Sequence, residues 1–185
     1  LAYKPTKKIG VLYTKSEINS IVIVDELKGL AVSHGIEIVA IPFNDVNGKP
    51  NALNAPEALV KMHKEKVGWL YLPPDSHLGT VAQNIVIPEA HKLGIPTFAS
   101  TEQLMQAGAA FGLLSSYYEL GIIAGQKAYD ILINGRKPQD IPIDRPPRFL
   151  RKVNTEVALS LGFKNLVENL HLIEPLDVND RPRPR

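Results

Sequence analysis

The chain has 185 residues, 44% of them hydrophobic and 22% charged, and its formal net charge is +2. This composition is typical of a globular protein with one sizeable hydrophobic core, and so small a net charge gives no reason to expect nucleic acid as a partner. The chain contains no cysteine, which excludes thiol catalysis, disulfide bonds and cysteine-ligated zinc.

Short apolar runs alternate with segments of helical spacing along the chain. In chain order, we expect a strand at residues 9–13, a helix at 17–34, a strand at 36–41, a polar loop at 44–53, a helix that begins at Asn54, a strand at 68–72, a helix at 80–93 that Pro88 interrupts, a strand at 95–99, a short helix at 102–107, a strand at 109–114, a long helix at 117–133, a strand at 148–153 and a helix at 155–161. Continuously apolar strands that alternate with helices are typical of a parallel sheet covered on both faces. The sequence therefore predicts an α/β fold, a Rossmann-like parallel sheet with helices on both faces.

Local signals set the expected ends of two helices. Ile23, Leu27 and Leu30 recur at helical spacing, which predicts the first helix, and Gly35 is its stop signal. Asn54 and Glu57 have the spacing of a capping box, so we expect the Asn54 side chain to cap the second helix.

The loop after the first strand raises a question of chemistry. Thr14-Lys15-Ser16 lies between a strand and a helix start, an arrangement that aims backbone N–H groups and a positive helix end at an anion. The glycine spacings of phosphate-binding and dinucleotide-binding loops are absent from it. The residues alone leave two alternatives, a carboxylate-binding loop or a plain helix cap.

Polar residues follow the other predicted strands as well. Because ligands bind beyond the carboxyl ends of the strands in such sheets, these segments form the candidate site. The candidate ligand-binding residues are Thr14, Ser16, Glu17, Asn44, Pro74, Asp75, Ser76, Ser100, Thr101, Glu102, Ser115, Ser116 and Tyr117.

Groups suited to catalysis are few, and we expect no catalytic residue, cofactor or metal ligand. The five histidines are scattered, and neither H-E-x-x-H nor G-x-S-x-G occurs. Asp75 and His77 could form an acid/base pair, or a turn in which Asp75 or Ser76 caps the next helix. Trp69 lies inside a strand, which favours core packing over a ligand platform. A capping role for Ser116 would leave the two tyrosines that follow it unexplained.

Five segments of the chain together resemble one protein family. They are KKIGVLYTKSE (7–17), GWLYLPPDS (68–76), IPTFASTEQLMQAGAAFGLLSSYYELG (95–121), INGRKPQDIPID (133–144) and LRKVNTEVALSLGF (150–163). The family is that of the ABC-transporter substrate-binding proteins which include tryptophan- and tyrosine-binding members.

The resemblance implies one lobe of a type I periplasmic-binding-protein fold, in which two lobes close on a ligand. It divides the chain into a carboxyl-terminal lobe (1–116), a crossover helix and hinge segment (117–147), a returning strand and helix (148–163) and a tail (164–185). The helix at 117–133 would pack on the other lobe. In its absence we expect the apolar stripe Leu120, Ala124, Ala128 and Ile131 to pair with a second copy, giving a homodimer.

The resemblance also implies a function. The chain would belong to the extracytoplasmic solute-binding component of an ABC importer, in the periplasm or on an extracellular membrane-anchored lipoprotein, delivering a small molecule to the membrane permease. An aromatic or hydrophobic amino acid is the first expected ligand. A ligand-sensing input domain of a signalling receptor and an enzyme on a doubly wound sheet are the alternatives.

The family resemblance assigns roles to two parts of the site. Thr14, Ser16 and their amides would hold a ligand carboxylate. Family members often carry Asp just before the Tyr-Tyr pair, placed for a ligand ammonium group, whereas this chain has Ser116. A neutral hydroxyl cannot balance a buried ammonium charge, so either Glu102 or the other lobe supplies it, or the ligand is not an α-amino acid.

Overall fold

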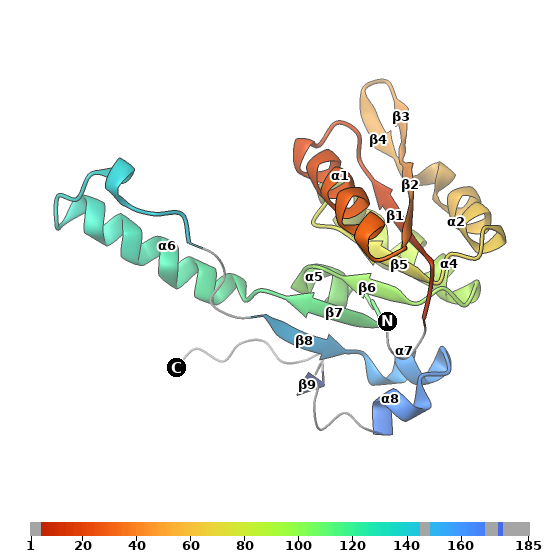
Figure 1. The fold of residues 1–185 in the computed structure, drawn as a ribbon. Coiled ribbons are helices and arrows are strands. Elements are labelled where there is room, and N and C mark those ends of the chain that lie inside the picture. The colour runs from red at the N-terminus through yellow and green to blue at the C-terminus, as the bar shows by residue number, and fades with distance from the viewer. Residues whose placement is uncertain (1–4, 145–148, 169–173, 176–185) are drawn as a thin grey trace.

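The computed structural model describes residues 5–144, 149–168 and 174–175 (Figure 1). Its strands are β1 (Lys8–Tyr13), β2 (Glu37–Pro42), β3 (Asn44–Val46), β4 (Lys49–Asn51), β5 (Trp69–Leu72), β6 (Thr97–Ala99), β7 (Phe111–Leu114), β8 (Leu150–Val153) and β9 (Glu174–Pro175). Its α-helices are α1 (Ile18–Ser33), α2 (Ala55–Lys64), α3 (Ser76–Val81), α4 (Ile87–Lys92), α5 (Glu102–Gln106), α6 (Tyr117–Leu132), α7 (Thr155–Ser160) and α8 (Lys164–Glu168). The alternation expected from the sequence is confirmed.

One mixed sheet organises the molecule. Its strand order is β2-β1-β5-β6-β7-β8-β9, and all neighbours from β2 to β7 are parallel. β8 runs antiparallel to β7, and β9 is parallel to β8. The predicted α/β class is therefore confirmed, with an edge that departs from the parallel pattern. This edge is reached after the long excursion of α6, so β8 enters the sheet from the opposite end.

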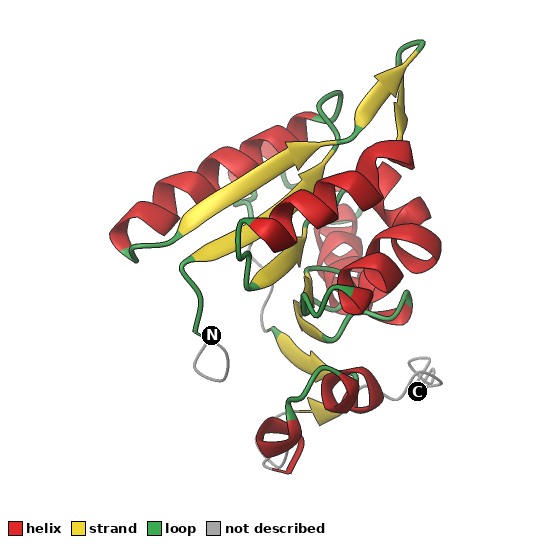
Figure 2. Ribbon diagram, turned by 90° about the vertical axis from the view of Figure 1, so that its right-hand side faces the viewer, coloured by secondary structure: helices red, strands yellow, loops and turns green. Residues whose placement is uncertain are grey.

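Helices cover both faces of this sheet (Figure 2). The larger core joins strand residues such as Leu12, Leu70 and Leu72 to α2, α3, α4 and α5. A smaller core joins the sheet to α7 and α8, and Trp69 packs there with ring centroids 5.3 Å from Phe111 and 5.5 Å from Phe163. The expected core role of Trp69 is confirmed.

The buried face of α1 does not follow the spacing of Ile23, Leu27 and Leu30. Ser20, Val24 and Ala31 are its buried residues, whereas Leu30 is 65% exposed. Apolar residues lie on nearly every side of this helix, so their spacing does not distinguish an inner face. Contact with β1 and β2 decides which face is buried.

The expected polar loop at 44–53 is a β-hairpin instead, formed by β3 and β4. Asn47 and Gly48 connect the two strands with φ values of 55° and 74°, the left-handed conformations that a two-residue hairpin turn requires. The Asn-Gly pair is a sequence signal for this turn, and the polar composition of the segment obscured it. The prediction of a loop was therefore wrong.

The capping box at Asn54 is also wrong. The side chain of Asn54 makes no cap hydrogen bond; its Oδ1 accepts from the Asn44 amide at 3.0 Å and its Nδ2 donates to the Pro42 carbonyl at 3.0 Å. A tertiary contact to the base of the hairpin replaces the local cap.

Two further boundaries moved. The third helical region begins at Ser76, earlier than expected, and its irregular π-helical turn spans Ala82–Val86. Pro88 lies in the first turn of α4, directly after that π-helical turn, so its missing N–H falls where the regular helical hydrogen-bond ladder is already interrupted.

Part of the expected tail at 164–185 is ordered as α8 and β9, because Leu166 packs into the smaller core. The terminal RPRPR lies outside the described residues.

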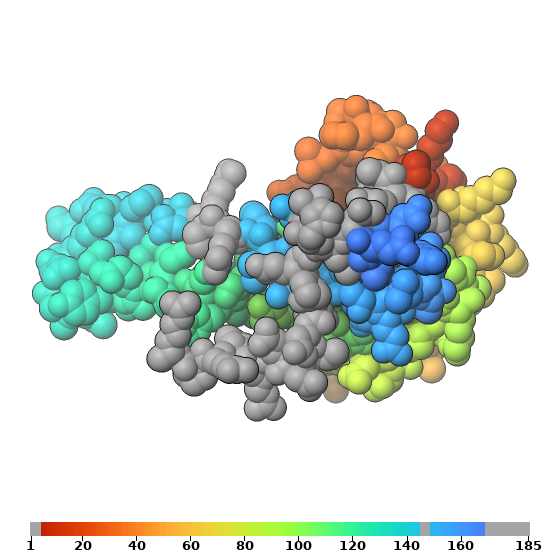
Figure 3. All heavy atoms as spheres, turned by 90° about the horizontal axis from the view of Figure 1, so that it is seen from below, coloured from red at the N-terminus to blue at the C-terminus, as the bar shows by residue number. Residues whose placement is uncertain are grey.

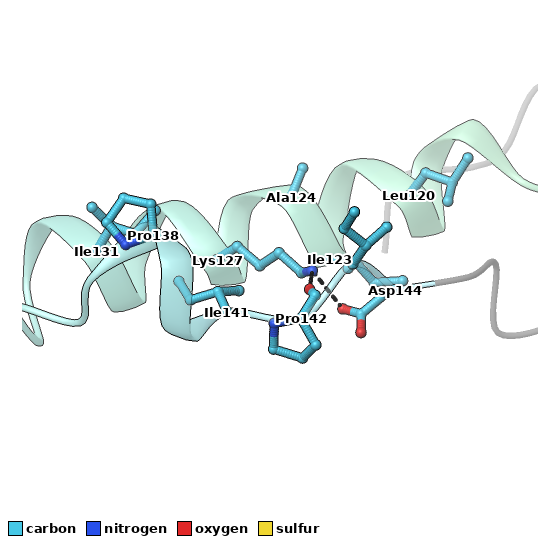
Figure 4. Close-up of a pocket in the computed structure, with 10 residues that line it drawn as sticks. Leu120, Ile123, Ala124, Lys127, Ile131, Pro138, Ile141, Pro142 and Asp144 are labelled. Atoms are coloured by element: carbon cyan, nitrogen blue, oxygen red, sulfur yellow. Dashed lines mark hydrogen bonds and ion pairs between the residues drawn. The ribbon is translucent and has the colours of Figure 1, made fainter.

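The helix α6 projects away from the sheet (Figure 1). None of its sixteen residues is buried, and the chain returns along it through a short 3-10 helix, Pro138–Asp140. Lys127 joins the two, forming an ion pair of 3.0 Å with Asp144 and a hydrogen bond to the Pro142 carbonyl (Figure 4). Within the described parts of the chain, no helix is both long and apolar enough to cross a membrane.

Candidate functional site

The strand order of the sheet reverses at β1, which has β2 on one side and β5 on the other. The loops that leave the carboxyl ends of β1 and β5 therefore flank a topological switch point, the place where open α/β sheets bind ligands. Residues 14–20 and 74–78 form these two loops and the helix starts that follow them.

Asp75 connects the two loops from below the surface. The residue is 4% exposed, and each carboxylate oxygen accepts two hydrogen bonds. Oδ1 accepts from the Thr14 hydroxyl at 2.9 Å and the Leu78 amide at 2.8 Å. Oδ2 accepts from the Thr14 amide at 2.7 Å and the Ser20 hydroxyl at 2.7 Å. A buried carboxylate thus obtains full hydrogen bonding without a cation.

Glu17 makes the reciprocal connection from the other loop. Its carboxylate accepts from the Ser76 amide at 3.0 and 3.1 Å and from the His77 amide at 3.3 Å. The side chain of Asn19 adds a third link, donating to the Pro74 carbonyl at 2.8 Å. We call Asp75 and Glu17, with the donors they hold, the carboxylate clasp. It joins segments that lie 55 to 61 residues apart in the sequence.

The clasp decides between the alternatives for Asp75 and His77. Asp75 caps α3 through the Leu78 amide, so the capping alternative is confirmed. The His77 ring instead meets Phe43 edge-on, with centroids 5.0 Å apart. Its Nε2 atom is buried and has no hydrogen-bond partner among the described residues.

The clasp also determines which predicted residues remain accessible at this edge. Thr14 is 1% exposed, and its amide and hydroxyl both bind Asp75. Ser16 is exposed. Ser20, which the sequence did not single out, belongs to the clasp, and its neighbour Asn19 links the same two loops through the Pro74 carbonyl. Their position in the first turn of α1 was the available signal, because it places them beside the same loop as Thr14.

The strands beyond β5 contribute the remaining predicted residues. The Ser100 hydroxyl donates to the Leu72 carbonyl at 2.8 Å, and Thr101 caps α5 through the Leu104 amide. Glu102 lies half-buried in the first turn of α5. Burial raises the pKa of the Tyr71 phenol above its ordinary value, and a hydrogen bond with Ser100 opposes that shift. Sequence reasoning missed Tyr71, which stands within the apolar run of β5.

Two predicted regions lie outside residues 14–20 and 74–78. Asn44 is exposed in the β3–β4 hairpin. Ser116 caps α6 through the Glu119 amide at 3.3 Å, and Tyr117 and Tyr118 after it are 57% and 62% exposed. In the described part of the chain, no group of three or more histidine, aspartate or glutamate side chains could hold a metal ion.

Two hollows of the described surface lie elsewhere, along α6. One has a volume of about 390 Å³ and is lined by Leu120, Ile123 and Ile131 of the helix and by Pro138 and Ile141 of the returning segment (Figure 4). A second, also of about 390 Å³, adjoins it. Both are open and mostly apolar, and neither contains a residue of the clasp. In the view from below, this arm extends to one side of the lobe (Figure 3).

A family model described as ABC transporter substrate binding protein matches residues 4–172. The chain belongs to this family. Among its relatives, a tyrosine-binding protein of Clostridioides difficile is 34% identical over 169 residues, which are 91% of this chain and 46% of the relative.

Solved structures of substrate-binding proteins show the same fold. A ligand-free, open substrate-binding protein with adhesive properties from Clostridium difficile is 28% identical, with a TM-score of 0.69 over 87% of this chain and 52% of that one. A Streptococcus pneumoniae ABC domain in complex with L-Trp is 24% identical, with a TM-score of 0.69 over 84% of this chain and 50% of that one. This member of the substrate-binding family thus spans about half the length of the relatives it matches.

Proposed function

We propose that the protein is the solute-binding component of an ABC importer and acts outside the cytoplasm. Membership of the substrate-binding family is the observation that carries this proposal. The permease of the importer would be its membrane partner, and the periplasm or an extracellular lipoprotein anchor would be its setting. No catalytic role is assigned to any residue of the site.

The proposed ligand is an aromatic or other hydrophobic amino acid. The relatives support this class, one named for tyrosine and another solved with L-Trp. The switch point between β1 and β5 would bind the polar end of the ligand, with Ser16, Glu17, Ser76 and Glu102 at its rim.

We further propose that the ligand cleft lies between this lobe and a second one. The chain covers 46% and 52% of its relatives, and α6 projects from the lobe with none of its residues buried. Residues 1–116 would then form one lobe, 117–147 the crossover helix and hinge, 148–163 the returning strand and helix, and 164–185 the carboxyl-terminal tail, which includes α8 and β9.

Calorimetry tests this function. The chain is measured alone and fused behind the amino-terminal half of the Clostridioides relative, with L-tyrosine, L-tryptophan and L-leucine as ligands. We expect micromolar affinity for an aromatic amino acid in the fusion and millimolar or weaker affinity in the single lobe, since a micromolar complex has about −8 kcal/mol to divide between two lobes. Tight binding by the single lobe would contradict the shared cleft. A folded fusion that binds none of the three would contradict the ligand class.

A further inference from the structure

The hydrogen-bond donors at the switch point are already in use. Six N–H and O–H groups from the two loops bind either Asp75 or Glu17: the Thr14 amide and hydroxyl, the Ser20 hydroxyl, and the amides of Ser76, His77 and Leu78. A ligand carboxylate entering here would have to displace one of these carboxylates. The clasp therefore does not offer the anion site that the sequence of the first loop suggests.

The two carboxylates of the clasp differ in what they can still do. Asp75 is buried, and both of its oxygens are fully used by donors. Glu17 is half-buried, and two amides among the described residues donate hydrogen bonds to it. A carboxylate has about four acceptor positions, so Glu17 keeps acceptor capacity. Among the described lysines and arginines, none lies within ion-pair distance of it.

Glu17 is also held in place, which distinguishes it from the other acid of this rim. The backbone amides of Ser76 and His77 fix its carboxylate, whereas none of the described residues donates a hydrogen bond to the Glu102 side chain of α5. A fixed carboxylate with spare acceptor capacity suits a ligand N–H group that carries positive charge, because such hydrogen bonds are short and strong. Ser116, which caps α6, supplies no charge for that purpose.

We propose that Glu17 is the residue of this lobe that binds the ammonium group of the ligand. The inference rests on the proposed function and specifies its ligand: a primary amine, such as an α-amino acid, whose carboxylate binds away from the clasp. Asp75 acts as a positioning residue, since it holds the loop that carries the Ser76 and His77 amides.

Nuclear magnetic resonance on the 185-residue chain tests this assignment at millimolar ligand, where single-lobe binding is measurable. The three probes share an indole: L-tryptophan, tryptamine, which lacks the carboxylate, and indole-3-propionate, which lacks the amine. The Ser76 and His77 amides donate directly to Glu17 and report on its partner. We expect L-tryptophan and tryptamine to shift both amide resonances and indole-3-propionate to leave them unchanged.

The variant Glu17→Gln removes the charge and keeps an oxygen for the two amides, and Glu26→Gln, at an exposed position of the same helix α1, is the matched control. The dissociation constant of tryptamine should rise at least tenfold in Glu17→Gln and stay unchanged in Glu26→Gln. Two results would overturn the assignment of Glu17 and leave the proposed function standing. In one, indole-3-propionate shifts the two amide resonances and tryptamine does not. In the other, tryptamine binds equally well to the wild type and to Glu17→Gln. The comparison of the three probes is made in the wild-type chain, so its result does not depend on the folding of a variant. If none of the probes shifts any resonance, the assignment and the proposed aromatic amino-acid ligand both fail.

Discussion

Asp75 is the buried charge that holds the sheet edge together. Four donors from the β1 loop, α1 and α3 converge on its two oxygens. Burying an ionised group is unfavourable unless hydrogen bonds replace its water, and here they do so completely. The clasp is therefore stable only while carboxylate and donors are both present.

Removing the Asp75 carboxylate should destabilise the fold strongly. In Asp75→Ala, the Thr14 and Leu78 amides lose their partners inside the protein, and each buried unsatisfied group costs about 1–3 kcal/mol. We expect the free energy of unfolding to fall by about 3–5 kcal/mol, measured by urea titration. Asp45→Ala is the control, since the one described hydrogen bond to the Asp45 side chain comes from the exposed Gly48 amide, and a loss of about 1 kcal/mol or less is expected. Equal losses in the two variants would contradict the role of Asp75.

At the scale of elements, backbone conformation decides what a glycine contributes. Gly48 turns the β3–β4 hairpin with a φ of 74°, a conformation that other residues adopt only at a cost. Gly29 lies on the outer side of α1, and a Cβ there would have no neighbour within 4 Å. In a helix, alanine is favoured over glycine because glycine loses more backbone entropy on folding.

The same substitution should therefore have opposite effects at these two glycines. Gly29→Ala should raise the free energy of unfolding by about 0.5–1 kcal/mol. Gly48→Ala should loosen the hairpin by about 1–2 kcal/mol, seen as faster hydrogen exchange of its amides, with less effect on global unfolding. Stabilisation by both substitutions would show that the hairpin turn tolerates a side chain.

At the scale of the whole molecule, α6 is the element whose apolar surface a single lobe leaves exposed. Ile122, Tyr129 and Leu132 are each more than half exposed, and two apolar hollows lie along the same helix. Contiguous exposed apolar surface of this kind usually marks an interface. In the two-lobe arrangement proposed above, the second lobe would cover it.

Without that lobe, we expect the 185-residue chain to form a homodimer through α6. Light scattering at increasing concentration should show twice the monomer mass, and Leu132→Glu should shift the equilibrium toward monomer, since a charge in an apolar contact is unfavourable. Val32→Glu on α1, which is equally exposed at 79%, is the matched control and should leave the dimer intact. A wild-type chain that stays monomeric at all concentrations would contradict this expectation.

The sequence by itself determined the order of strands and helices, the α/β class and the residues that follow each strand. These follow from local patterns: apolar runs, helical spacing, and the glycines and prolines that end them. The Asn-Gly turn at residues 47–48 was equally local and could have been predicted. The buried face of α1 could not be predicted from the sequence. A helix with apolar residues on nearly every side has no preferred face until a sheet covers one.

Only the tertiary structure decided what the polar residues of the sheet edge do. Thr14 and Asp75 both had the character of ligand-binding residues in the sequence, yet they bind each other across 61 positions. Asn54 had the spacing of a cap, yet it holds a hairpin. The physical reason is that a hydrogen-bonding side chain takes whichever partner lies within about 3 Å, and strand pairing, not sequence distance, determines which groups come that close.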